Sequence, residues 1–333
     1  MSTDHGVRAT EADVFARIEQ FRRRDPRLRE RHVTLAHGAG GKSSAALLEA
    51  VFLPAFGLTG LTGQTDAALV DVPPGHRLAF TTDSYVVTPA RFPGGSIGDL
   101  AVNGTINDLA MMGARPIALS LAFVLEEGLP VEELREIVAD AAAAAASAGV
   151  GIVTGDTKVV ERGSCDGIFI TSTGIGAVPT GLSLDASHVR DGDVVLVSGP
   201  IAEHGLAVLL ARGDLALDAD IESDTAPLHE LVAALLSAAP TTRWMRDATR
   251  GGLGTVCNEL AAASATAVVL HESEIPVRPV VAGACELLGI DPLYVANEGR
   301  FVAVVPPDEA DAALAALRAQ PAGEGATRVG VIR

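Results

Sequence analysis

The sequence predicts a two-domain protein of the α/β (α+β) class, on the evidence of its length, its hydrophobic content and the alternation of its segments. The 333 residues are enough for about two domains. Apolar residues make up 48% of the chain, so each domain can bury a core and disorder throughout the chain is excluded. From His32 onward, strand-like and helix-like segments alternate, which is typical of sheets covered by helices.

The segments follow from their hydrophobic period and from the glycines and prolines between them. Strands are predicted over residues 77–82, 117–125, 150–154, 168–173, 193–198, 267–271, 301–305 and 328–332. Helices are predicted over 11–21, 45–52, 97–112, 131–147, 202–212, 226–237, 252–264, 278–288 and 309–319. We therefore expect a charged extension over residues 1–31, an N-terminal domain over 32–180 and a C-terminal α/β domain over 181–333.

Composition excludes several classes of protein. The net charge of −17 repels nucleic acid and anionic membranes, so neither is expected as a partner. Met1–Thr10 is polar and no apolar run reaches 18 residues, which predicts a cytoplasmic protein. The three cysteines are widely spaced and form no CxxC motif, which argues against disulfides and a cysteine zinc site.

Basic residues are distributed unusually, because only two of the 25 are lysines. Lys42 lies in a glycine-rich segment, and Lys158 follows Asp156. Both positions are candidates for contact with phosphate, since a lysine ammonium is a compact point charge that arginine does not reproduce. The Arg-rich stretch 22–31 is interpreted as a solvated helix face.

Four aspartates are expected at the ends of predicted elements: Asp66, Asp83, Asp108 and Asp156. Asp83 comes directly after one predicted strand and Asp156 comes two residues after another, where α/β proteins place ligand contacts. A turn or a helix cap explains any one of them alone. Their recurrence favours a shared Mg²⁺ site, because clustered carboxylates repel one another unless a cation joins them.

A polar stripe runs along the otherwise apolar helix predicted over 97–112. Asp99, Asn103 and Asn107 are spaced four residues apart and therefore share one face. A solvent-facing stripe usually carries Lys, Glu or Arg, and this one carries none. The stripe therefore favours a helix that faces a ligand.

Glycine-rich segments suggest where phosphate would bind. Gly38, Gly40, Gly41 and Lys42 lie in HGAGGK, ahead of the helix predicted over 45–52, although the spacing is not that of a Walker A loop. In the second half, Asp247, Arg250 and Gly251 open the helix predicted over 252–264, and NEGR precedes the strand at 301–305. A turn is the simpler interpretation of each segment. Together they suggest a cleft between the domains.

Six motifs together resemble a known superfamily: HGAGGK, TTDS, NGTINDLAMMGARP, GDTKV, DATRGGL and NEGR. They are similar to those of the ATP-dependent aminoimidazole ribonucleotide synthetases, selenophosphate synthetases and thiamine-monophosphate kinases. The residues of these motifs are most similar to those of the hydrogenase maturation factors that act as carbamoyl dehydratases, and the match spans about residues 32–332. The absence of a cysteine near HGAGGK argues against the selenophosphate branch.

The resemblance implies a homodimer in which the N-terminal sheets pair into a barrel, with ATP near the interface. It implies Mg²⁺ on Asp66, Asp83, Asp108 and Asp156. It implies nucleotide contacts from Gly38, Gly40, Gly41, Lys42, Asn103, Asn107, Thr157, Asp247, Arg250 and Gly251. The implied reaction is ATP-dependent dehydration of a carbamoyl group on a C-terminal cysteine to thiocyanate, the source of cyanide for the iron of nickel–iron hydrogenase.

Glu298 is the candidate base for that reaction, and Lys158 would orient it or stabilise the transferred phosphoryl group. The implied partners are the carbamoyl transferase HypF, which loads the cysteine, and the scaffold pair HypC–HypD, which accepts the cyanide. Family members end in Pro-Arg-Ile-Cys, whereas this sequence ends in Val331-Ile332-Arg333. We therefore expect ATP binding and slow hydrolysis without self-cyanation. The alternatives are another synthetase or kinase of the superfamily, or a non-catalytic ATP-binding partner in hydrogenase assembly.

Overall fold

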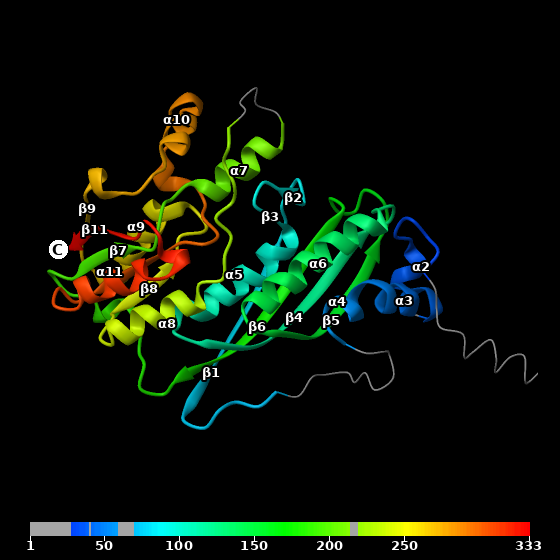
Figure 1. Ribbon diagram of the computed structural model, residues 1–333, viewed down its shortest axis with the longest axis horizontal. Helices are drawn as coiled ribbons and strands as arrows, with labels where there is room; N and C mark the ends of the chain where they lie inside the picture. Colours follow the sequence, from blue (N-terminus) through cyan, green and yellow to red (C-terminus); the bar gives the residue numbers. More distant parts are fainter. Residues whose placement is uncertain (1–27, 40, 59–69, 214–218) are drawn as a thin grey trace, which may run out of the picture.

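The computed structural model describes residues 28–39, 41–58, 70–213 and 219–333. These residues form two main sheets. In Figure 1 the C-terminal sheet lies at the left, and the N-terminal sheet lies in the centre and toward the right. All strands of the first main sheet lie before residue 180, and all strands of the second lie after residue 193. The helix predicted over 11–21 lies outside the described residues.

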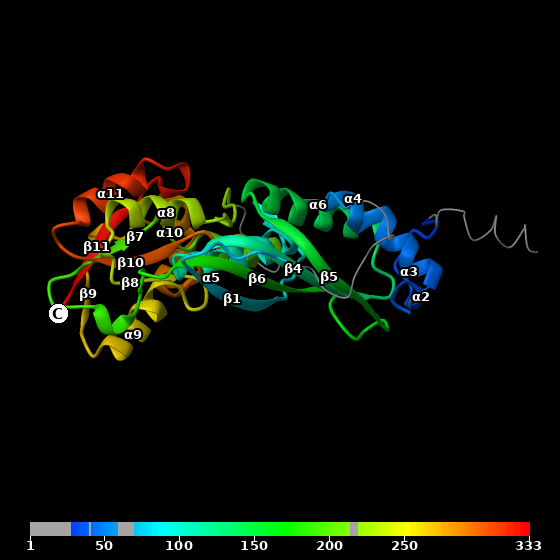
Figure 2. The ribbon, with the colours of Figure 1, turned by 90° about the horizontal axis from the view of Figure 1, so that it is seen from below.

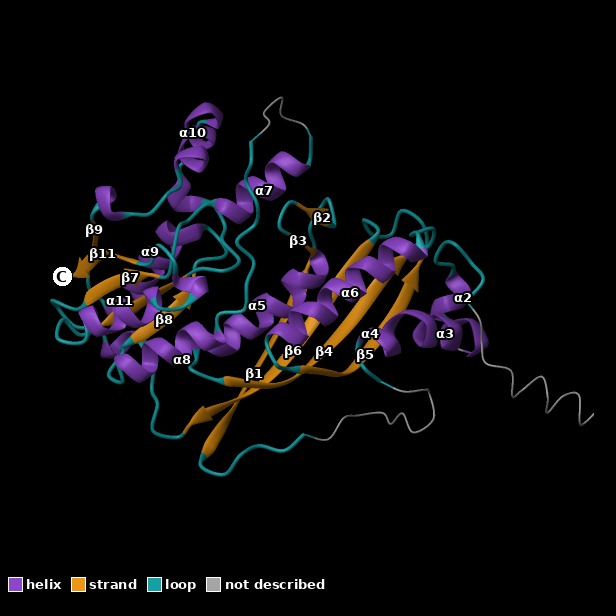
Figure 3. Cartoon of the chain, viewed as in Figure 1, coloured by secondary structure: helices purple, strands orange, loops and turns teal. Residues whose placement is uncertain are grey.

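The N-terminal sheet has the strand order β1-β6-β4-β5, from β1 (His76–Tyr85), β6 (Ile168–Pro179), β4 (Arg115–Glu126) and β5 (Gly151–Val160). β6 pairs antiparallel with β1 and with β4, while β4 and β5 are parallel. That parallel pair needs a crossover, which helix α6 (Val131–Ser147) supplies. Figure 3 shows α6 and α5 (Ile97–Met111) running across the same face of this sheet.

The sequence explains where these two helices begin and end. Ser96 caps α5 by accepting the N–H of Gly98, and Asp99 accepts the N–H of Ser96 in return. α6 follows Pro130, carries Glu132 and Glu133 in its first turn, and ends before Gly149, whose φ is +65°. The predictions for both helices are confirmed to within one residue.

Short helices cover the far end of the N-terminal sheet: α2 (Leu35–Gly38), α3 (Gly41–Leu47), a π-helical turn over Leu48–Phe52, and α4 (Leu53–Ala55). The helix predicted over 45–52 begins earlier, at Gly41, so Gly41 and Lys42 lie within a helix rather than ahead of it. A Cβ on Gly38 would lie 2.6 Å from the backbone nitrogen of Val159, so α2 packs directly against β5. Figures 1 and 2 both place α2 and α3 at the end of the molecule opposite the C-terminal sheet.

The C-terminal sheet has the order β8-β10-β7-β11-β9 and is antiparallel throughout. Its strands are β7 (Val194–Val197), β8 (Trp244–Asp247), β9 (Val268–Leu270), β10 (Phe301–Val305) and β11 (Thr327–Ile332). Its helices are α7 (Glu203–Ala211), α8 (His229–Ala238), α9 (Gly252–Ser264), α10 (Pro279–Leu288) and α11 (Ala310–Arg318). Figure 2 shows α8 and α11 on one face and α9 on the other.

Alternating side chains of the central strands fill both cores of this domain. Val195 and Val197 pack with α9 and α10, while Val194 and Leu196 pack with α8 and α11. The end of α5 contributes Ala110 and Met111 to the second of these cores, which joins the two halves of the molecule.

Three predicted strand ends need correction, one of them in β6, which continues past Thr173 to Pro179. β1 extends to Tyr85 and β5 extends to Val160, so Asp83 and Asp156 lie within strands rather than after them. β8 and the short pair β2 (Arg91–Phe92) and β3 (Gly95–Ser96) were not predicted. In the described part of the chain, no helix is both long and apolar enough to cross a membrane.

Candidate functional site

A cavity of about 560 Å³ lies where the two halves of the molecule meet. Its lining comes from the end of β1, from α5, from one side of α7, from the end of β8 and the turn after it, and from the loop before β10. The charged side chains that it brings together are Asp83, Asp108, Arg212, Asp247, Arg250 and Glu298. The predicted cleft between the halves therefore contains five of the predicted site residues.

The aspartates of this cavity come from three different elements. Asp83 lies on β1, Asp108 on α5, and Asp247 at the end of β8. Asp108 accepts a hydrogen bond from the hydroxyl of Thr81 at 2.8 Å. Burial, together with the negative charges of Asp247 and Asp83, raises the pKa of Asp108 to about 6. A positively charged ligand would relieve this repulsion.

Arg250 supplies positive charge at the rim of the cavity. Its guanidinium lies 3.3 Å from Asp83, while 84% of the side chain is exposed. An exposed arginine so close to the aspartates can reach an anionic ligand, since its fork-shaped donors match phosphate oxygens.

Glu298 is the most strongly perturbed acid of the cavity. Its side chain is only 12% exposed. Burial raises the pKa of Glu298 well above the usual range, and the carboxylates of Asp224, Asp247, Asp83 and Asp108 raise it further. A carboxylate whose charge is this unfavourable accepts a proton readily, which suits a general base.

Two buried side chains fix the backbone around Glu298. Asp224 accepts the N–H groups of Glu298 and Gly299 at 3.1 and 3.2 Å. Asn107 donates to the carbonyl of Glu298 at 3.0 Å and also contacts Ala226 and Leu228. The Glu298 loop is therefore held from both sides.

The polar stripe on α5 consequently has a different role from the predicted one. Asn103 and Asn107 are buried, and Asn103 donates to the hydroxyl of Thr225 at 3.2 Å. The stripe faces the C-terminal half of the molecule rather than the cavity, because its partners are the loops that bring in Glu298. Asp99 caps its own helix.

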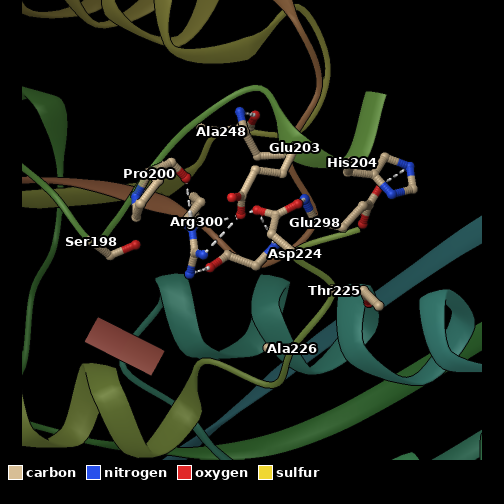
Figure 4. Close-up of polar contacts among 12 residues, drawn as sticks. Ser198, Pro200, Glu203, His204, Asp224, Thr225, Ala226, Ala248, Glu298 and Arg300 are labelled. Carbon is tan, nitrogen blue, oxygen red and sulfur yellow. Dashed lines mark hydrogen bonds and ion pairs between the residues drawn. The ribbon is translucent and has the colours of Figure 1, made fainter. Parts of the chain in front are cut away.

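A buried ion-pair network lies behind Glu298. The guanidinium of Arg300 lies 3.3 Å from Glu203 and 3.6 Å from Asp224 (Figure 4). Arg278 also pairs with Glu203. Glu203 and Asp224 therefore each have an arginine partner. The network balances the negative charge of Asp224, the residue that holds the Glu298 loop.

Two further groups near Glu298 were not predicted from the sequence. His204, on the first turn of α7, places Nε2 at 4.0 Å from Oε1 of Glu298. Figure 4 shows the two side chains as neighbours. Tyr85 lines the cavity over Gly104, and burial raises the pKa of its phenol well above the usual range. His204 is isolated in the sequence, so only the fold brings it to the acids, whereas Tyr85 lies two residues after Asp83 but belongs to none of the predicted motifs.

The remaining predicted site residues lie elsewhere in this chain. Asp156, Thr157 and Lys158 are on β5, the edge strand opposite β1, and Gly38 packs beside them. Asp83 pairs with Ser172, which pairs with Leu121, which pairs with Gly155. Asp83 and Asp156 are therefore at nearly the same level, three strand spacings or roughly 14 Å apart.

Within the described part of one chain, Asp156 lies apart from Asp83 and Asp108, so the cluster of four metal-binding aspartates stays a prediction. Asp66 and Gly40 lie outside the described residues. Gly41 begins α3 and Lys42 follows it, whereas Gly251 precedes α9 with a φ of +72°. Within the described ranges, no group of three or more His, Cys, Asp or Glu side chains is arranged closely enough to hold a metal ion.

Comparison with known proteins identifies the family. Residues 64–178 match the N-terminal domain model of AIR synthase related proteins, and residues 190–333 match the C-terminal domain model. A carbamoyl dehydratase HypE from Rhodobacter capsulatus is 56% identical over 306 residues, which are 91% of this chain and 89% of the relative. This chain belongs to the HypE family of carbamoyl dehydratases.

Solved HypE structures agree with this assignment. A HypE crystallised in complex with ATP superposes with a TM-score of 0.86 at 46% identity, covering 90% of this chain and 89% of that one. The HypE of a HypE–HypF complex superposes with a TM-score of 0.76 at 45% identity, covering 79% and 86%. The predicted fold and the predicted hydrogenase maturation role are confirmed at the level of the family.

Proposed function

We propose that this chain dehydrates an S-carbamoyl group to thiocyanate at the expense of ATP, with Glu298 as the general base. The observation that carries the proposal is the buried Glu298 carboxyl, whose pKa is raised in a cavity that also holds three aspartates and Arg250. Membership of the HypE family supports the reaction, and the HypE structure solved in complex with ATP supports the nucleotide. The product would supply cyanide to the iron of nickel–iron hydrogenase.

The chemistry requires an acid–base group at the amide. The amide oxygen attacks the γ-phosphorus of ATP and the bond to ADP breaks, so that the oxygen becomes part of a phosphate leaving group. An N–H proton is removed as the C=N bond forms. Loss of phosphate and of the second N–H proton then gives the C≡N bond. Glu298 would accept protons from the nitrogen, since its carboxylate is destabilised by its surroundings.

The aspartates are suited to Mg²⁺ that accompanies ATP. Asp83 and Asp108 line the same cavity and offer hard oxygen donors, and phosphate oxygens of ATP together with water would complete the ligands of the ion. Mg²⁺ bound there would neutralise phosphate charge. Arg250 would contact phosphate oxygens from the rim of the cavity.

We propose that a second copy of the chain completes the site. Leu78, Phe80 and Val153 are 53%, 68% and 39% exposed on the N-terminal sheet. An exposed apolar sheet face favours pairing with an identical face in a homodimer barrel. Lys158, Asp156, Thr157 and the segment with Gly38, Gly41 and Lys42 would then act at the interface, and ATP would bind near it.

Partners and location follow from the family. The HypE–HypF complex supports HypF as the partner that loads the carbamoyl group. The pair HypC–HypD is proposed from the resemblance alone, as is action in the cytoplasm. We also retain the division into domains at 32–180 and 181–333 as a proposal.

The test replaces the base without changing its shape. The sequence through Arg333 is extended by a flexible tail that closes in Pro-Arg-Ile-Cys, and HypF loads the cysteine with a carbamoyl group. Mass spectrometry then follows the ATP-dependent loss of one water. Glu298→Gln should lower the rate by at least about a hundredfold, because it removes the proton acceptor. ATP binding, measured by calorimetry, should be unchanged.

The matched control is Glu286→Gln on the exposed side of α10, which should react at the wild-type rate. A Glu298→Gln variant that still loses water rapidly would refute Glu298 as the base. Formation of aminoimidazole ribonucleotide or phosphorylation of thiamine monophosphate by the unmodified chain would favour the other enzymes of the superfamily.

A further inference from the structure

His204 is held against the Glu298 loop, because residues before and after it in the sequence donate hydrogen bonds to that loop. The backbone N–H of Ala202 donates to Oδ1 of Asn297 at 2.7 Å, and the N–H of Gly205 donates to the carbonyl of Ala296 at 3.0 Å. The segment 202–205 is therefore bound to the residues directly before Glu298. Ala202 adopts a left-handed φ of +73° there, a conformation that a non-glycine residue holds only when its surroundings impose it.

The two ring nitrogens of His204 face different partners. Nε2 faces Oε1 of Glu298, and Nδ1 lies 2.8 Å from the hydroxyl oxygen of Ser223. The ring is 9% exposed and packs edge-on against Phe92. In unliganded sites, hydrogen bonds of catalytic groups are often longer than in the substrate complex, so the 4.0 Å to Glu298 is within reach of closure on substrate binding.

The pair His204 and Ser223 also connects two cavities. His204 lines the cavity of about 560 Å³ that contains Glu298. Ser223 lines a separate cavity of about 770 Å³, whose wall includes the exposed Glu222 and Glu324. The imidazole and the hydroxyl therefore form a bridge of two proton-carrying groups from the buried base to a solvent-open cavity.

The reaction needs such a path. Each amide nitrogen loses two protons on the way to thiocyanate, and a single carboxylate holds only one. Glu298 must therefore release the first proton before it can accept the second. The cavity around it is already occupied by acids, and ATP would cover its open side.

We propose that His204 and Ser223 carry protons from Glu298 to the second cavity. The Glu298 carboxyl gives its proton to Nε2 of His204, the proton on Nδ1 passes to the Ser223 oxygen, and the hydroxyl proton of Ser223 passes to water. The imidazole, left protonated at Nε2, returns to its starting tautomer by exchange with water after each transfer, so the relay is reset before it carries the next proton. This inference rests on the proposed role of Glu298.

The surroundings of His204 suit a conductor of protons rather than a store. Burial lowers the pKa of His204 to about 4, so the ring is neutral between transfers and does not retain a second proton. The backbone N–H of Thr225 donates to the Ser223 oxygen at 3.2 Å, which holds that hydroxyl in place beneath the ring.

The test is chemical rescue of the carbamoylated, tail-bearing chain described above. His204→Ala should lower the first-order rate of water loss about tenfold to a hundredfold, because proton release becomes limiting. Imidazole in the buffer should restore most of that rate by entering the vacated space. 1-Methylimidazole should not restore it, because methylation leaves only one nitrogen able to exchange a proton.

Three further variants keep the result interpretable. His204→Gln preserves volume and a hydrogen bond to Ser223 but cannot pass a proton, so it should stay slow. Ser223→Ala should also be slow and should not respond to imidazole. His229→Ala replaces a similarly buried histidine outside the cavity, and its rate should be near wild type and insensitive to imidazole. Thermal melting and ATP titration confirm that each variant folds.

Wild-type activity in His204→Gln, or equal rescue by imidazole and 1-methylimidazole, would overturn the relay and leave His204 as a positioning residue. Full activity in His204→Ala would exclude both roles. These results are distinct from a failure of the proposed base, because that failure would appear as rapid water loss by Glu298→Gln whatever the behaviour of His204.

Discussion

The carboxyl group of Asp108 makes the crowding of acids in the cavity measurable. Its pKa is raised to about 6 by burial and by its acidic neighbours, above the value near 4 expected in the unfolded chain. The folded state therefore binds this proton more tightly, and the associated stability is present below pH 4 and lost as the pH rises through about 6. Because the direction of this dependence of stability on pH is defined, it can be tested by substitution.

Asp108→Asn should melt at a higher temperature than the wild type at pH 7 to 8 in the presence of a chelator, because the amide cannot acquire the unfavourable charge. The two proteins should converge near pH 4 to 5. Mg²⁺ with ATP should stabilise the wild type more than the variant. Identical melting curves for the two chelated proteins at every pH would show that Asp108 is not perturbed. Asp311→Asn, a change at an exposed position, serves as the control.

At the scale of residues, the acids and Arg250 could be predicted because they occur in recurring motifs beside apolar segments. His204 and Asp224 could not, because each stands alone in the sequence and acquires its role from long-range contacts. Asp224 lies 74 residues from Glu298, whose N–H it accepts. No local pattern encodes such a pairing.

Elements were predicted well in their interiors and poorly where polar residues continue a strand. The predicted strands stop at Thr82 and Thr154, yet β1 and β5 continue through Asp83 and Asp156. One face of each strand is open to the cavity or to solvent, so a strand there tolerates polar residues that local propensity assigns to loops. α6 and β10, by contrast, have the predicted bounds because apolar period and flanking breakers agree.

Gly299 offers a test of the loop that carries Glu298. A Cβ at this position would lie 1.8 Å from the carbonyl oxygen of Asp224. Gly299→Ala must therefore displace either the loop that carries Glu298 or the backbone at Asp224. We expect a lower melting temperature and a loss of water-forming activity, measured by calorimetry and by the mass assay. Gly283→Ala, in the middle of α10 with open space around it, should instead stabilise the chain by about 0.5–1 kcal/mol. Activity retained in Gly299→Ala would show that the loop position is not critical.

At the scale of the whole molecule, the predicted site is divided between two regions. Glu298, Asp83, Asp108, Asp247 and Arg250 share the cavity, whereas Lys158 is exposed on β5 at the other edge of the N-terminal sheet. All of them were predicted to share one site, because the order of motifs in a sequence does not show whether two motifs act within one chain or across two chains. The homodimer proposed above would account for this division, because it would bring Lys158 of one protomer to Glu298 of the other.

Mixed dimers test this arrangement directly. Lys158→Ala and Glu298→Gln should each be inactive alone. If the two residues act across the interface, a dimer that contains one chain of each variant has one intact site, so random re-association of equal amounts should recover about one quarter of wild-type activity. If they act within one chain, no mixed dimer has an intact site and the mixture stays inactive. Lys158→Arg should also be slow, because the guanidinium does not reproduce the compact ammonium charge. Recovery in the mixture, seen only after dimers exchange subunits, would assign Lys158 to the partner's active site.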